Sequence, residues 1–187
     1  VIINETPTLI YPTAMYPHKN MHILIDVAKI LKLQNFKLKF ELTIDSLSGN
    51  TEANFCKKIL KAGLKDYFVF LGRLDRSALL EKIKNSTAII MPTLIETYGL
   101  PYLEAQYLRK PMFTSKRDFS EDVCGHSAFY FDPLNPDDIA KVIINNINNK
   151  HKLLDKLLES DKLLNERITW QKSTDNVNNI INLMLKN

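Results

Sequence analysis

The chain has 187 residues, of which 45% are hydrophobic and 25% charged, a composition that is ordinary for one soluble globular domain. This balance excludes a disordered or collagen-like chain, and no apolar run approaches the ~20 residues that a membrane-spanning helix needs. The 25 basic residues exceed the 21 acidic ones by four, which is compatible with a phosphorylated ligand and too small an excess to indicate nucleic acid. The first five residues lack the basic start and apolar core of a secretion signal. The location that we expect is the cytoplasm.

Short apolar runs alternate with longer segments of helical period along the first 150 residues. We expect strands at residues 8–11, 38–44, 67–71, 87–91, 112–115 and 128–131. We expect helices at residues 19–33, 52–62, 77–84, 100–109 and 136–146. The strands lack polar alternation, which is typical of a parallel sheet covered on both faces. The sequence therefore predicts an α/β fold with a doubly wound, Rossmann-like parallel sheet.

The segment 150–187 is predicted to be a helical tail of the same domain. Trp170 and residues 177–185 indicate a final helix, and no repeat or flexible linker divides the chain, so residues 1–187 form one domain. Leucines among mixed charges over 151–167 predict an amphipathic helix that faces a core. The alternative, a helix on a membrane surface, is disfavoured by the mixture of charges. The leucines are Leu153, Leu154, Leu157, Leu158, Leu163 and Leu164.

The two cysteines, Cys56 and Cys124, form no Cys-x-x-Cys pair. We expect both to be reduced thiols in the core, as free cysteines usually are. Reduced thiols weakly favour a reducing compartment.

Ligands of an open parallel sheet bind outside the carboxyl ends of its strands, so the loops at those ends are the candidate sites. The five glycines are too widely spaced for a Gly-x-Gly-x-x-Gly motif, and a Walker loop, His-Glu-x-x-His and Asp-x-Asp are absent from the sequence. The commonest nucleotide sites are therefore disfavoured, and the sequence predicts no metal site.

The first candidate loop is residues 16–20, between the first strand and the first helix. A cation such as Lys19 at a helix start opposes the helix dipole, unless a bound anion is shared between Lys19 and the helix amides. The other interpretation is that Lys19 is solvated and Asn20 caps the helix. His18 adjoins Lys19 and is the histidine for which a site role is conceivable.

The second candidate loop follows the strand at 87–91 and carries Glu96 and Gly99. Gly99 permits a tight turn or a close backbone approach, and Pro101 suits the first turn of a helix. The amides at the start of that helix could then face an anion. For Glu104 the alternative role is compensation of the helix dipole, and for Glu96 it is that of an ordinary loop carboxylate.

Glu96 and Glu104, separated by seven residues around 98–101, resemble the signature of the retaining GT-B glycosyltransferases of the large group 1 family (family-four-like). The similarity extends over residues 9–147 and covers the C-terminal, donor-binding domain of that family. An N-terminal acceptor domain would precede this chain, and the tail through Trp170 resembles helices that pack back across the two domains. Further matching positions are Gly72, Pro92, Pro111, Ser115, 121–123 and 129–133.

The resemblance implies a role for each matched residue. Glu96 would contact hydroxyls of the transferred sugar, and Lys19 would hold the diphosphate, which makes these two the catalytic candidates. Glu104 would accept hydrogen bonds from the nucleotide ribose. The other implied donor-binding residues, which would lie against the sugar, the diphosphate or the base, are Tyr98, Gly99, Leu100, Thr97, His18, Gly72, Arg73 and Leu74.

The implied reaction is transfer of a hexose-type sugar from a UDP- or GDP-linked donor to an acceptor hydroxyl with retention, without a cofactor or metal, in polysaccharide or glycoconjugate synthesis. The partners would be the nucleotide sugar and the chain's own acceptor domain, which could bring peripheral association with the inner face of a membrane. The sequence departs from the family at Ala14, where a second diphosphate-binding arginine is common, and at Lys110, where glycine is. A sugar-nucleotide epimerase, a phosphorylase of the same fold and a non-catalytic binding domain remain alternatives.

Overall fold

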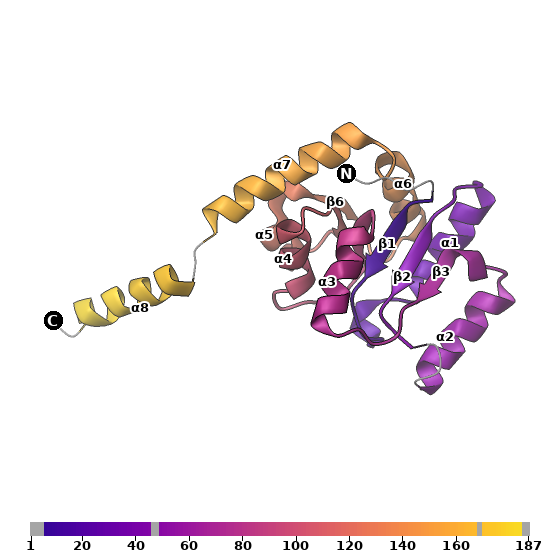
Figure 1. The fold of residues 1–187 in the computed structure, drawn as a ribbon, viewed down its shortest axis with the longest axis horizontal. Helices are drawn as coiled ribbons and strands as arrows, with labels where there is room; N and C mark the ends of the chain where they lie inside the picture. Colours follow the sequence, from indigo (N-terminus) through magenta and orange to yellow (C-terminus); the bar gives the residue numbers. More distant parts are fainter. Residues whose placement is uncertain (1–5, 46–48, 168–169, 185–187) are drawn as a thin grey trace.

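The computed structural model describes residues 6–45, 49–167 and 170–184, and its centre is a six-stranded parallel sheet (Figure 1). The strand order is β3-β2-β1-β4-β5-β6, so the direction of winding reverses between β1 and β4. In open α/β sheets this reversal opens a crevice at the carboxyl ends of the strands. The strands are β1 (Thr8–Tyr11), β2 (Lys39–Leu42), β3 (Phe68–Phe70), β4 (Ala88–Met91), β5 (Met112–Ser115) and β6 (Ala128–Phe131).

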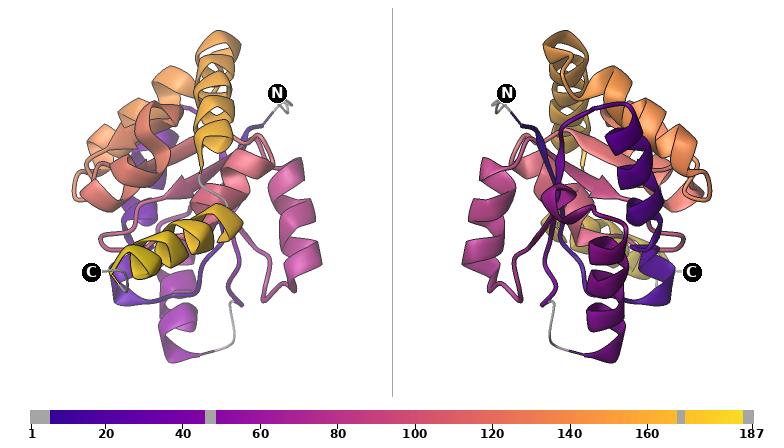
Figure 2. Two further views of the ribbon diagram at one scale, coloured as in Figure 1. Left: turned by 90° about the vertical axis from the view of Figure 1, so that its left-hand side faces the viewer. Right: turned by 90° about the vertical axis from the view of Figure 1, so that its right-hand side faces the viewer.

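Helices cover both faces of this sheet, with α1 and α3 on opposite sides of it (Figure 2). Helix α6 packs against α1, and α7 contacts α4. The predicted α/β, doubly wound, Rossmann-like fold is confirmed. The helices are α1 (Ile23–Leu33), α2 (Asn50–Lys61), α3 (Arg76–Asn85), α4 (Leu100–Tyr107), α5 (Asp118–Cys124), α6 (Pro136–Asn146), α7 (Lys150–Glu166) and α8 (Trp170–Met184).

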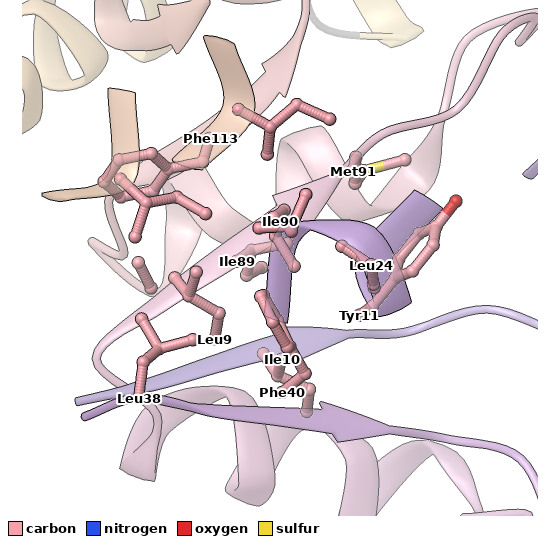
Figure 3. Packing of buried hydrophobic residues seen from close by; sticks show 14 of the residues in the cluster. Leu9, Ile10, Tyr11, Leu24, Leu38, Phe40, Ile89, Ile90, Met91 and Phe113 are labelled. Atoms are coloured by element: carbon pink, nitrogen blue, oxygen red, sulfur yellow. The ribbon is translucent and has the colours of Figure 1, made fainter. Parts of the chain in front are cut away.

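The core includes the two strands that flank the reversal. Every residue of β4 is buried, and the last three residues of β1 have no exposed surface. Figure 3 shows Ile10, Ile89 and Phe113 in this packing. Burying a side chain of this size contributes roughly 1.5–3 kcal/mol, so the two strands that position the crevice belong to the most strongly held part of the sheet.

Three local expectations differ from the structure. The helix expected from residue 19 begins at Ile23, because residues Pro17–Lys19 form a 3-10 turn. Asn20 ends that turn with φ 52°, so it is not the cap of α1. Helix α5 is absent from the sequence prediction because its seven residues are too few to show a helical period.

Helix α7 lies against the domain, but its apolar stripe is narrower than expected. Leu153 and Leu157 are buried, whereas Leu154 and Leu158 are 46% and 48% exposed, so the expectation of a core position is wrong for these two. Helix α8 extends beyond the end of α7, apart from the sheet (Figure 1). It exposes an apolar row of Val177, Ile180, Ile181 and Met184; Leu185 lies outside the described residues.

Both cysteines are free. Cys124 is buried as expected, but Cys56 is only partly buried, so it is not a core residue. Burial raises the pKa of the Cys124 thiol to about 12, and the neighbouring Arg167 opposes this rise. Among the described helices, none combines the length and apolar character needed to cross a membrane.

Candidate functional site

The turn that follows β1 is fixed to the ends of two other strands. The side-chain amide of Asn20 donates hydrogen bonds to the carbonyl of Pro92 at 3.2 Å and to the carbonyl of Pro133 at 2.8 Å. These carbonyls follow β4 and β6. A side-chain amide carries two donors, so one residue can hold both backbones. Asn20 therefore positions Lys19, its neighbour, relative to the loop after β4.

Further hydrogen bonds reinforce this attachment. The carbonyl of His18 accepts from the backbone N–H of Leu94 at 2.8 Å and from the hydroxyl of Thr93 at 3.1 Å. The hydroxyl of the fully buried Tyr11 donates to the carbonyl of Lys19 at 2.7 Å. The backbone of residues 18 and 19 is thus hydrogen-bonded both to the loop after β4 and to Tyr11 at the end of β1.

The ammonium group of Lys19 forms an ion pair with the carboxylate of Glu96, which lies in the loop after β4. The two side chains are only 16% and 12% exposed. Burial, followed by the Glu96 charge, raises the pKa of Tyr11 well above its ordinary value. The pair lies at the β1–β4 reversal, where the fold predicts a ligand crevice. The alternative of a solvated Lys19 is therefore wrong.

The start of α4 depends on Gly99. This residue has φ 71°, and a Cβ atom placed on it would come within 2.6 Å of the ring of the buried Tyr102. Only glycine satisfies both conditions without strain. In the described part of the chain, the N–H groups of Gly99 and Leu100 form no backbone hydrogen bond. Free amides at a helix start can bind an anion.

Glu104 lies in the second turn of α4, and its side chain is 7% exposed. Its Oε1 accepts a hydrogen bond from Nη1 of Arg76, the first residue of α3. The carboxylate therefore has a cationic partner from another helix and does not serve only to compensate a helix dipole. The local sequence around Arg76 gives no sign of this contact.

A second arginine, Arg167, lies at the end of α7. It donates to the hydroxyl of Tyr98 at 2.9 Å, to the side-chain oxygen of Gln106 at 2.9 Å and to the carbonyl of Val123 at 2.7 Å. Tyr98 is an expected donor-binding residue, so the end of α7 contacts the candidate site. Neither Arg76 nor Arg167 belongs to a motif, and their long-range contacts have no counterpart in local spacing.

A pocket of about 670 Å³ borders the loop after β4. Three expected site residues, Glu96, Thr97 and Tyr98, contribute to its wall. Its opposite wall comes from α5, the helix that the sequence did not predict. The lining consists of Leu94, Ile95, Glu96, Thr97, Tyr98, Arg117, Asp118, Phe119, Asp122, Val123 and Arg167.

The remaining expected residues lie near the same edge of the sheet but do not line this pocket. His18 has an exposed side chain, and its ring stacks on Tyr16 with a centroid separation of 5.8 Å. Gly72, with φ 70°, follows β3 and donates its N–H to the carbonyl of Ile44 at 3.1 Å. Arg73 is exposed and Leu74 is partly buried in the same loop. The loop after β3 thus contacts the end of β2, whereas the Lys19–Glu96 pair joins the segments that follow β1 and β4.

Potential metal ligands do not gather in the described ranges, where no group of three or more His, Cys, Asp or Glu residues could hold an ion. The cation of Lys19 and the N–H dipoles at the start of α4 could stabilise an anionic ligand near the reversal. This edge of the sheet thus combines hydrogen-bond donors that can bind an anion with carboxylates that can accept from hydroxyl groups.

The model of the family described as "Glycosyl transferases group 1" matches residues 1–177. This chain belongs to the group 1 glycosyltransferases. The resemblance found in the Glu96–Glu104 region is thereby confirmed at the level of the family.

Among group 1 relatives, an O-antigen chain mannosyltransferase of Salmonella typhimurium, RfbU, is 27% identical over 127 residues, which are 67% of this chain and 33% of that protein. The Anabaena protein HepE, crystallised in complex with UDP-glucose, superposes with a TM-score of 0.79 at 17% identity over 95% of this chain and 49% of HepE. Sucrose-phosphate synthase from Thermosynechococcus elongatus superposes with a TM-score of 0.80 at 14% identity over 97% of this chain and 46% of the synthase. The chain thus spans about half the length of these structures, and the likeness shows a shared GT-B-type fold.

Proposed function

We propose that this chain is the donor-binding half of a retaining glycosyltransferase that transfers a sugar from a nucleoside-diphosphate donor to an acceptor hydroxyl. The observation that supports this most is the largely buried Lys19–Glu96 ion pair at the reversal of strand order, on a loop that ends at the free amides of Gly99 and Leu100. The complex of HepE with UDP-glucose supports a nucleotide sugar as the donor class.

Lys19 and Glu96 exchange partners when the donor binds. In the free protein each compensates the charge of the other. A donor brings a diphosphate for the ammonium group and sugar hydroxyls for the carboxylate, which can only accept hydrogen bonds. Each charge-assisted hydrogen bond contributes about 1.5–3 kcal/mol net, so the donor can replace the interaction that it breaks.

Catalysis follows from stabilisation of the leaving group. The bond between the anomeric carbon and the diphosphate oxygen breaks, and the electron pair stays on the diphosphate. The acceptor oxygen forms the new bond on the face that the diphosphate leaves, which retains the configuration, and its proton passes to the departing diphosphate oxygen. An ammonium group at ~4 Å in a medium of effective dielectric ~20 contributes about 4 kcal/mol of Coulomb energy before desolvation. The amides at the start of α4 add fixed dipoles. The proposal assigns no protein nucleophile and includes no metal or cofactor.

Glu104 is assigned to the nucleotide ribose, and the loop after β3, with Gly72, Arg73 and Leu74, to the base. The acceptor site is assigned to a further domain, because the chain spans about half the length of the solved relatives that it matches. Contact with the inner face of a membrane, where polysaccharide or glycolipid acceptors reside, would come through that domain.

Titration of the 187-residue chain with UDP and with GDP, followed by backbone amide NMR shifts, tests the donor assignment. We expect one of the two nucleotides to shift the amides of Gly99 and Leu100. Lys19→Ala should abolish these shifts, whereas Lys84→Ala, which removes an exposed cation from the last turn of α3, should leave them unchanged. Absence of shifts at Gly99 with both nucleotides contradicts the proposal.

A further inference from the structure

The ion pair between Arg76 and Glu104 is asymmetric. The Arg76 side chain is 64% exposed, whereas that of Glu104 is 7% exposed. An exposed arginine has no need of a partner, but a buried carboxylate that loses its partner is strongly destabilised. The ion pair is therefore needed to compensate the buried charge of Glu104, and not to stabilise Arg76.

The contact also fixes one oxygen of the carboxylate and leaves the other available. Nη1 of Arg76 donates to Oε1 of Glu104, and none of the described residues donates to Oε2. A carboxylate has about four acceptor sites on two oxygens, so Oε2 can accept hydrogen bonds while Oε1 stays occupied. The planar guanidinium restricts rotation of the carboxylate more than an ammonium group would.

The arginine itself is placed firmly. Arg76 is the first residue of α3, and the preceding Asp75 caps that helix by accepting from the N–H of Ala78 at 2.8 Å. Helix α3 begins a few residues after Gly72, which lies in the loop after β3. The cap thus ties the backbone of Arg76 to the loop that is assigned to the base, and Glu104 holds its guanidinium.

We propose that Arg76 is a positioning residue that orients Glu104 so that its free oxygen accepts hydrogen bonds from the ribose hydroxyls of the donor. This inference rests on the proposed function and adds to it a residue outside the Glu96–Glu104 motif. Arg76 acts on the nucleotide through Glu104, and its charge is directed to that carboxylate rather than to the diphosphate. It therefore governs the discrimination between ribose and deoxyribose and leaves phosphate binding to Lys19.

Calorimetric titration of the full chain tests this role with four probes. These are UDP or GDP, whichever the wild type binds, the matching 2′-deoxynucleoside and 3′-deoxynucleoside diphosphates, and inorganic pyrophosphate. The wild type should bind at least one deoxy analogue about tenfold more weakly than the ribonucleotide, the loss of one charge-assisted hydrogen bond. Arg76→Ala should reduce this ratio to less than about threefold and leave the pyrophosphate affinity unchanged. Lys84→Ala, on the same helix, should keep the wild-type ratio.

Arg76→Lys keeps the positive charge and provides a second readout if the alanine variant does not fold. For Arg76→Lys, the ratio of the affinity for the ribonucleotide to that for the deoxy analogue should lie between the wild-type ratio and the Arg76→Ala ratio. The reason is that an ammonium group orients the carboxylate less well than a guanidinium does. A wild-type ratio in either folded variant overturns the inference while the proposed function stands. Failure of the wild type to bind either nucleotide overturns the proposed function, and the inference with it.

Discussion

Arg167 and Tyr98 are 69 positions apart in the sequence, yet Nη1 of the arginine donates a 2.9 Å hydrogen bond to the hydroxyl of the tyrosine. The same guanidinium holds Gln106 in α4 and the carbonyl of Val123 in α5. Arg167 therefore joins the end of α7 to both walls of the pocket beside Glu96. The loop after β4 depends on a residue near the end of the domain.

Replacement of Arg167 by alanine should reduce the free energy of unfolding by about 2–4 kcal/mol, because the oxygens of Gln106 and Val123 lose a charged donor in a buried setting. Denaturation in urea measures the change. Arg109→Ala is the matched control: its ion pair with Asp161 is largely exposed and should contribute about 0–1 kcal/mol. Equal losses in the two variants would refute a structural role for the Arg167 contacts.

Gly99→Ala should destabilise the domain by about 2–4 kcal/mol, because the new Cβ combines an unfavourable φ with a clash against the ring of Tyr102. Gly72→Ala separates the two effects. Gly72 has a similar φ of 70° but no atom within 4 Å of the added Cβ, so only the backbone term of about 1–2 kcal/mol applies. Thermal unfolding of the pair, compared with the wild type, measures both. A Gly72 variant that is as unstable as the Gly99 variant would exclude the clash.

Lys19→Ala should destabilise the protein by about 3 kcal/mol, because it leaves the Glu96 carboxylate mostly buried without its cation. The double change Lys19→Met with Glu96→Gln removes both charges, and its stability should return to within about 1 kcal/mol of the wild type. Nucleotide binding, measured by calorimetry, should be lost in both variants. Recovery of binding in the double variant would mean that the pair has a structural role alone.

Glu41, on β2, gives a pH-dependent prediction. Burial raises the pKa of its carboxyl above the ordinary 4.5, and Lys82 and Lys39 partly oppose this rise. The folded state thus binds this proton more tightly than the unfolded state, so its contribution to stability is complete below pH 4.5 and is lost as the pH rises through the raised pKa.

Glu41→Gln removes this dependence, so the variant should gain stability relative to the wild type between pH 4 and pH 7. Urea denaturation at several pH values measures the difference. Glu81→Gln, at an exposed position of α3, controls for the loss of one negative charge. A constant difference between the Glu41 variant and the wild type would argue against the raised pKa.

The sheet could be predicted from the sequence because its strands are continuous apolar runs, and the runs that became β4 and β5 are buried on both faces. The turn at residues 17–19 could not, since the φ of Asn20 depends on hydrogen bonds to Pro92 and Pro133, which lie 72 and 113 positions away. Tertiary contacts of this kind override the local propensity for a helix that starts at Lys19.

The sequence motif indicates Glu96, Glu104 and Lys19 as candidates, but it gives no sign that each carboxylate has a cationic partner. Lys19 reaches Glu96 because β1 and β4 are neighbours in the sheet. Arg76 and Arg167 lie at a helix start and a helix end, where a charged residue is usually solvated. Their roles follow from the arrangement of α3, α4 and α7 and not from spacing along the chain.

The register that places Leu9 beside Ala88 and Ile10 beside Ile89 also has a kinetic consequence. This pairing joins segments almost eighty residues apart, and contacts of such sequence separation form slowly because a long loop must close first. A nascent or partly refolded polypeptide in which β4 has not yet joined β1 cannot bring Lys19 to Glu96. Nucleotide binding would therefore appear only after β4 has paired with β1. In a refolding experiment, recovery of nucleotide affinity should lag behind recovery of helix content.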